Sequence, residues 1–140
     1  MYLDVSQEAG KQFYLSDVQG EIVMLNLLKF NAVADYSNHP GLGPEESISG
    51  QRAYKLYMNS ALPFIREAGS KVLFYGRAMP FLIGPEAEEW DEMLLVSHVE
   101  KKEFLAFAQH PGYLKIKGHR QAALADSRLL PLLPQRIKIE

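Results

Sequence analysis

The stretch EIVMLNLLKF, residues Glu21–Phe30, decides the fold. Such a dense run of Ile, Val, Met and Leu leaves no face for water, so it predicts a β-strand that is buried on both faces. Asn26 interrupts the run. A buried amide without a hydrogen bond costs about 1–3 kcal/mol, so Asn26 needs a partner, which belongs either to the fold or to a ligand.

The segments on both sides of this strand alternate between helix and loop patterns. Ser6 is a suitable N-cap for a short helix that ends near Ser16–Gly20. Residues 31–50 are rich in Asn, Ser, Pro and Gly and predict a long loop. Apolar residues then recur at helical spacing from Gln51 to Ala68, where Gly69 is a stop signal and Pro63 should kink or briefly break the helix.

The second half of the chain repeats the order of strand and helix. KVLFYGRAMPFLIG, residues 71–84, predicts a strand, and the acidic loop PEAEE separates it from a third strand, WDEMLLVSHV, residues 90–99. Residues 100–126 return to helical spacing, and Pro111 should begin a second helical piece. SRLLPLLP, residues 127–134, predicts a short strand that Pro131 confines to an edge or a strand end.

This order predicts one α+β domain over residues 1–140, with the ferredoxin-like β-α-β-β-α-β pattern, an antiparallel sheet and an additional short N-terminal helix. In that fold the helices cover one face of the sheet. Residues Glu21–Phe30 are nevertheless apolar on both faces, because Met24 and Leu28 alternate with Leu25 and Leu27. We therefore expect a homodimer in which the uncovered sheet faces pack together as a dimeric α+β barrel.

Composition narrows the functional classes. The 140 residues are 47% hydrophobic, which suits one domain with one core. A net charge of −2 without a basic run argues against nucleic acid, and the absence of Cys excludes thiol chemistry and disulfides. No secretory signal or membrane span is recognisable, so we expect a soluble, cytoplasmic protein.

Several side chains are candidates for a ligand pocket between sheet and helices. Asn26 either lines such a pocket or braces the fold. Tyr54 and Tyr57 lie three residues apart on one helical face, where they form either a cleft or ordinary core. Arg120 is a candidate carboxylate clamp held by Asp126, and the alternative is a structural ion pair.

The histidines His39, His98, His110 and His119 show no metal-ligand spacing, and no nucleotide-binding or serine-hydrolase motif occurs, so we expect neither metal nor cofactor. His98 with Asp91 or Arg120 would form an acid/base pair if the fold brought them together.

Five segments resemble an uncharacterised family, domain of unknown function 1330 (DUF1330): VMLNLLKF, GQRAYKLYMNSALPFI, VLFYGR, WDEMLLVSH and PGYLKIKGHRQAALADSRLLPL. The resemblance implies a dimeric α+β barrel and no assigned activity. Its recurring positions correspond here to Asn26, Tyr54, Tyr57, Gly76, Trp90, Asp91, Tyr113, Arg120, Asp126 and Ser127. This chain departs from the family at SHVE, where many relatives have an aromatic-Pro-Ser entry to the second helix.

Three functional hypotheses follow. The first is a homodimer of unassigned biochemistry that binds a small carboxylate or aromatic molecule, with Asn26, Tyr54, Tyr57, Trp90, Asp91, His98, Tyr113 and Arg120 as the candidate pocket. The second is a cofactor-independent enzyme of the monooxygenase or isomerase kind, which depends on analogy with the fold. The third is a module that binds a protein partner through the 31–50 loop or the acidic PEAEEWDE segment.

Overall fold

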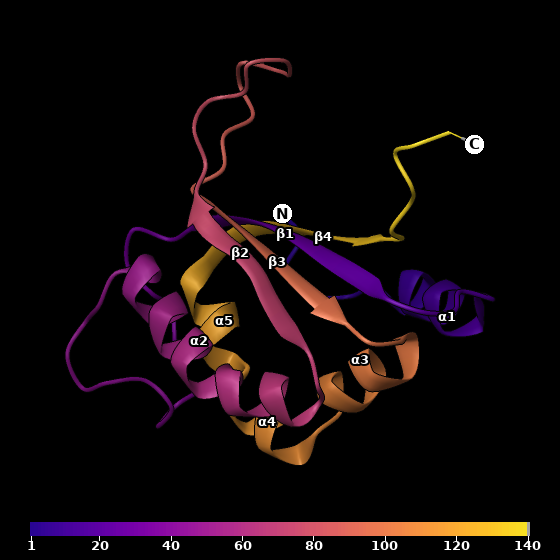
Figure 1. Cartoon of the computed structure of the whole chain (residues 1–140). Helices are drawn as coiled ribbons and strands as arrows, with labels where there is room; N and C mark the ends of the chain where they lie inside the picture. Colours follow the sequence, from indigo (N-terminus) through magenta and orange to yellow (C-terminus); the bar gives the residue numbers. More distant parts are fainter. Residues whose placement is uncertain (140) are drawn as a thin grey trace.

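The computed structural model describes residues 1–139. Its four strands form one antiparallel sheet in the order β2-β3-β1-β4. This arrangement confirms the predicted ferredoxin-like α+β fold. The elements follow one another along the chain (Figure 1) as α1 Gln7–Leu15, β1 Ile22–Phe30, α2 Gly50–Glu67, β2 Lys71–Arg77, β3 Glu92–His98, α3 Lys101–Ala108, α4 Pro111–Ile116, α5 Gly118–Ala123 and β4 Leu124–Leu132.

The helices α2, α3, α4 and α5 lie on one side of the sheet, and no helix formed by residues 1–139 covers the other side (Figure 1). Side chains of β1 alternate between the two sides, because successive residues of a strand point in opposite directions. Met24 and Leu28 are buried under the helices, whereas Leu25 and Leu27 on the opposite side are half-buried. We call the uncovered side the open face.

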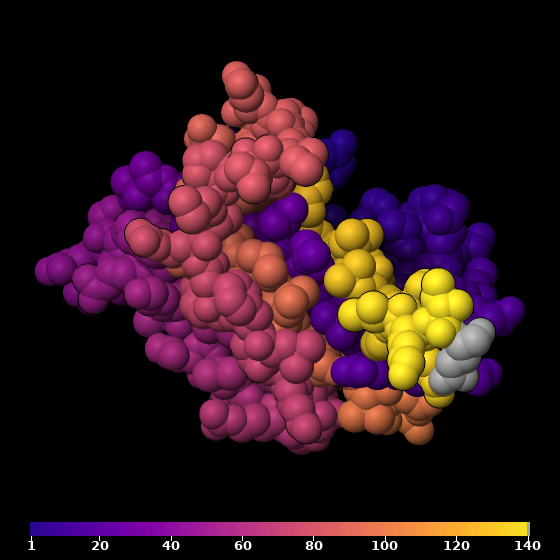
Figure 2. Space-filling model, turned by 45° about the horizontal axis from the view of Figure 1, so that its top comes forward, coloured from indigo at the N-terminus to yellow at the C-terminus, as the bar shows by residue number. Residues whose placement is uncertain are grey.

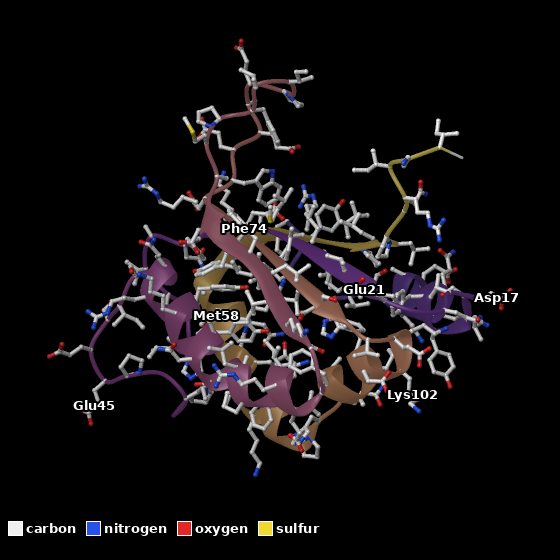
Figure 3. All side chains as sticks on the ribbon, viewed as in Figure 1. Asp17, Glu21, Glu45, Met58, Phe74 and Lys102 are labelled. Carbon is white, nitrogen blue, oxygen red and sulfur yellow. The ribbon has the colours of Figure 1, made fainter. Side chains whose placement is uncertain are left out.

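A row of apolar side chains crosses the open face from one edge of the sheet to the other. The strand registers place Phe74, Leu95, Leu25 and Leu130 side by side on β2, β3, β1 and β4. Phe74 and Leu130, at the two ends of the row, are 49% and 53% exposed. Figure 3 labels Phe74 on this side and Met58 on the helix-covered side.

Helix α2 begins and ends at residues that suit those positions. Ser49 caps the first turn, because its hydroxyl accepts a hydrogen bond from the backbone N–H of Arg52. Gly50 is required by close packing, since an added Cβ would lie 2.3 Å from the carbonyl oxygen of Asn31. Gly69 ends the helix with a positive φ of 73°. The helix continues through Pro63, so the predicted break is wrong.

The second predicted strand is too long. β2 ends at Arg77 rather than at residue 84, and residues 78–91 form a loop that projects beyond the sheet (Figure 1). We call residues 78–91 the hairpin arm. Met79, Leu82 and Ile83 follow the apolar pattern of a strand, yet they are 85%, 101% and 95% exposed. An apolar run predicts burial, and here no other segment of residues 1–139 provides it.

The last predicted helix is too long in the same way. Helix α5 ends at Ala123, so β4 begins at Leu124 rather than at residue 127. The alanine-rich sequence favours a helix, but pairing with β1 overrides that preference, and Lys29 lies opposite Asp126. β4 pairs only with β1, which confirms that Pro131 lies in an edge strand. Over residues 1–139, no helix is long and apolar enough to cross a membrane.

Candidate functional site

Asn26 is bonded to the sheet itself. Its side chain is 8% exposed, and its Nδ2 donates to the carbonyl oxygens of Met24 at 3.4 Å and Leu94 at 3.3 Å. The bond to Leu94 ties β1 to β3 on the helix-covered side, whereas the bond to Met24 lies within β1. The amide nitrogen is therefore accounted for by backbone groups, and a ligand-binding role of Asn26 stays a prediction.

A cluster of tyrosines lies between the sheet and α2, as the helical spacing predicts. The rings of Tyr54 and Tyr57 are 5.2 Å apart, and the hydroxyl groups of Tyr57 and Tyr113 are hydrogen-bonded at 2.8 Å. Burial raises the pKa of Tyr54 and of Tyr57 well above the usual value for a phenol. These hydroxyls stay protonated at physiological pH, so they act as neutral hydrogen-bonding groups.

Arg120 lies beside this cluster and is already bonded. Its guanidinium donates to the carbonyl oxygen of Leu3 at 2.8 Å and to Ser127 Oγ at 3.5 Å. Asp126 does not hold it, because the Asp126 carboxylate pairs with Arg128 at 2.8 Å. The predicted pairing of Arg120 with Asp126 is therefore wrong. The Arg120 guanidinium is instead hydrogen-bonded to the N-terminal segment, at Leu3. No local sequence pattern predicts this contact.

His98 lies at the opposite end of β3 from Asp91. Seven residues of extended chain separate them, a distance of roughly 20 Å. His98 Nδ1 is 2.6 Å from Ser70 Oγ, and burial lowers the pKa of His98 to about 4. The carboxylate of Asp91 accepts from the backbone N–H of Phe30 at 2.8 Å. The predicted acid/base pair of His98 and Asp91 is therefore not formed.

Trp90 belongs to the open face. The guanidinium of Arg128, which lies opposite Leu27 in the sheet, is 4.9 Å from the Trp90 ring and 4.8 Å from the Tyr2 ring. Such cation–π contacts hold the base of the hairpin arm and the N-terminal segment together. Trp90 thus lies on the other side of the sheet from the tyrosine cluster, so the eight candidate residues do not surround one space.

A cleft of about 310 Å³ lies where the N-terminal end of α2 meets the ends of β1, β2 and β3. Of the predicted residues only Asp91 lines it. The complete lining is Phe30, Asn31, Ala32, Ser49, Gln51, Arg77, Asp91 and Glu92. The cleft therefore joins polar groups from β1, the following loop, α2, β2 and β3.

Glu92 is the buried polar group of this cleft, with 5% of its surface exposed. Its carboxylate accepts from Gln51 Nε2 at 3.2 Å and from the hydroxyl of Tyr75. Burial, together with the hydrogen bond to Glu92, raises the pKa of Tyr75. The carboxylate has two neutral donors and, in the part of the chain that the structure describes, no cationic partner, so it is available to a ligand group that donates a hydrogen bond.

Arg77 supplies the positive charge at the same cleft. Its side chain is exposed, and it makes no hydrogen bond or ion pair within residues 1–139. A free guanidinium can bind a carboxylate through two parallel N–H···O bonds. Arg77 and Glu92 therefore give the cleft one anion-binding group and one group that accepts hydrogen bonds.

Four of these residues, Arg77, Gln51, Tyr75 and Glu92, are absent from the sequence prediction. One signal was present: Glu92 shares a strand face with Leu94 and Val96, so the alternation of β3 places a carboxylate on its buried side. The contribution of Gln51 could not be found this way, because the fold alone brings α2 to the end of β3.

A second, wider cleft of about 440 Å³ lies between the N-terminal segment, the loop after β1 and α5, and Asp4, Asp35 and His39 are among its lining residues. Next to His39, the Tyr36 hydroxyl is 2.7 Å from His119 Nδ1. Within residues 1–139, no group of three or more His, Asp or Glu side chains is arranged to hold a metal ion.

The fold and the cleft define a small α+β protein of the ferredoxin-like class. Known structures place it more closely. The RPA0582 protein of unknown function from Rhodopseudomonas palustris is 32% identical, with a TM-score of 0.85 over 96% of this chain and 98% of that one. A methylated form of RPA0582 aligns with a TM-score of 0.87 over 97% and 96% of the two chains. The chain belongs to the family of RPA0582.

A more distant structure supports the fold alone. A Dabb family protein with a ferredoxin-like fold from Mesorhizobium loti is 12% identical, with a TM-score of 0.53 over 84% of this chain and all of that one. No protein-family model matches the sequence, and no curated protein matches it either.

Proposed function

We propose that this protein is a cytoplasmic homodimer that binds a small carboxylate, in a family that corresponds to DUF1330. The observation that carries the proposal is that Arg77, whose guanidinium has no partner among residues 1–139, and Glu92, a buried carboxylate, line the same 310 Å³ cleft. In this proposal Arg77 takes the clamp role predicted for Arg120, whose guanidinium is bonded to the N-terminal segment.

The cleft suits a ligand with a carboxylate at one end and a hydroxyl or amino group at the other. The carboxylate would pair with Arg77, and the donor group would bind the Glu92 oxygens beside Gln51. Phe30 gives the cleft an aromatic wall, so an aromatic acid fits the same arrangement. A volume of 310 Å³ lies at the lower end of the range for small-molecule sites.

The dimer is supported by the open face. Phe74, Leu95, Leu25 and Leu130 form a continuous apolar row across four strands, and such a surface is unusual on a soluble monomer. In the proposed α+β barrel a second copy covers this row by packing its own open face on it. An isologous pair of this kind buries both faces with one two-fold axis.

An enzyme is the second candidate, and Glu92 is the observation that favours it. A buried carboxylate with a tyrosine hydroxyl bonded to it can act as a general base toward a ligand held by Arg77. A Caulobacter crescentus protein whose name gives a provisional assignment as an antibiotic biosynthesis monooxygenase shares the fold at 12% identity, with a TM-score of 0.50. That likeness supports the fold and no reaction.

The test is binding of a panel of small hydroxy, amino and aromatic carboxylic acids by calorimetry. We expect Arg77→Gln to weaken binding about ten- to a hundred-fold, the range for a lost charged hydrogen-bonding partner. Arg66→Gln, at the far end of α2, is the matched control and should bind as the wild type does. Equal affinity of the Arg77→Gln and wild-type proteins for every acid that binds would overturn the assignment of this cleft.

A further inference from the structure

The hairpin arm carries apolar side chains that are almost fully exposed. Leu82 and Ile83 at its tip are 101% and 95% exposed, and Met79 is 85% exposed. Single exposed aliphatic residues are ordinary on a protein surface. Two adjacent ones in a projecting loop, with a third three residues earlier in the same loop, point to a contact with another molecule.

The arm is built as a defined structure. Its base is closed by a hydrogen bond from the Ala78 N–H to the Asp91 carbonyl at 2.9 Å, and Trp90 Nε1 donates to Glu88 at 3.1 Å. At the tip the Phe81 ring lies against Gly84, where an added Cβ would be 2.8 Å from the ring. Phe81, folded against Gly84, is 42% exposed, whereas Leu82 and Ile83 beside it in the sequence are almost fully exposed.

The arm rises on the same side of the sheet as the open face. Figure 2 shows the open face between the arm at one end and the C-terminal segment, residues 133–139, at the other. In a face-to-face pair, a two-fold axis that exchanges these two ends brings the arm of one copy to the C-terminal segment of the other. Each copy then places its hairpin arm at the C-terminal segment of the other copy.

The charges of the two ends are complementary. The arm carries Glu86, Glu88 and Glu89 in its second half, whereas the C-terminal segment carries Arg136 and Lys138. An acidic arm that reaches a basic segment in the second copy is attracted to it, and the same charges disfavour arm-to-arm contacts.

We propose that the hairpin arm is a clasp for a second copy of this chain: Leu82 and Ile83 of each copy pack on the open face or the C-terminal segment of the other. The inference rests on the proposed dimer and assigns to it a second contact region. The clasp accounts for apolar residues that the sheet-to-sheet contact alone leaves in water.

Cross-linking tests the clasp directly, because the chain has no cysteine and one can be introduced alone. The Leu82→Cys protein is modified with a maleimide that carries a photoactivated cross-linker. It is then mixed with an equal amount of 15N-labelled wild-type protein that carries no cross-linker. Mass spectrometry should find the tip joined to residues 23–29 or 128–139 of the 15N chain. Lys102→Cys, an exposed position on α3, should give no such product.

Double substitution of Leu82 and Ile83 by Ser provides the second measurement. We expect the dimer dissociation constant to rise about ten-fold or more, because two buried aliphatic side chains are lost from each arm. Leu15→Ser on α1, where Leu15 is 65% exposed, should leave the constant unchanged. A wild-type dimer without cross-links from position 82 would overturn the clasp alone, whereas a wild-type monomer would overturn the proposed dimer and the clasp together.

Discussion

The two faces of one sheet differ in what covers them. On the helix-covered face Leu94 is 4% exposed and lies against α2 and its tyrosines. On the open face Phe74 and Leu130 are 49% and 53% exposed, although they are no less apolar. The sequence is apolar on both faces of the sheet, but residues 1–139 bury only the helix-covered face well. In the proposed dimer, a second copy of the chain covers the open face.

Substitution at adjacent positions of β3 gives the largest expected difference between the faces. Leu94→Ala should lower the free energy of unfolding by about 2–5 kcal/mol at any protein concentration, because it leaves a cavity in the core. Leu95→Ala, on the open face, should cost about 1 kcal/mol in dilute protein, where the side chain is only half-buried. Urea titrations at low concentration measure both, and equal losses would contradict the distinction between the faces.

A pH titration of His98 on the helix-covered face sharpens the comparison. His98 lies on the covered face, and burial lowers its pKa to about 4 from the usual 6.5. As pH falls below 6.5 the unfolded chain takes up a proton that the folded chain accepts only near pH 4. The free energy of unfolding should therefore fall by up to about 3 kcal/mol between pH 6.5 and 4 and then become level with respect to this group.

The His98→Gln protein provides the control for that titration. It should be less stable at pH 7, since the ring contact with Phe104 at 5.0 Å is lost, but its stability should change less between pH 6.5 and 4. Urea titrations at a series of pH values give the slope. If the free energy of unfolding of His98→Gln changed with pH as much as that of the wild type, His98 would not be the group whose lowered pKa causes the change.

The fold was largely predictable because the strongest signal came from the central strand. Glu21–Phe30 is apolar throughout, and the order of elements around it gives the ferredoxin-like pattern. Errors arose where a local pattern has two outcomes. The run that contains Met79, Leu82 and Ile83 has the composition of a strand, but only the fold shows that it extends beyond the sheet.

The candidate site was less predictable. The sequence favours aromatic and charged residues with familiar chemistry, and Tyr54, Tyr57 and Arg120 are of that kind. Arg120 is bonded to Leu3, which lies far away in the sequence, whereas the Arg77 side chain has no such bond to any described residue. Which arginine is free depends on contacts between distant segments, and spacing along the chain carries no information about them.

The mass of the wild-type protein in solution tests the central claim, that the open face is covered by a second copy. Sedimentation equilibrium at micromolar concentration should give twice the chain mass of 15.8 kDa. Leu25→Glu, which places a charge in the centre of the open face, should return the mass to that of one chain without unfolding it. A wild-type mass of 15.8 kDa across the measured concentrations would contradict the account.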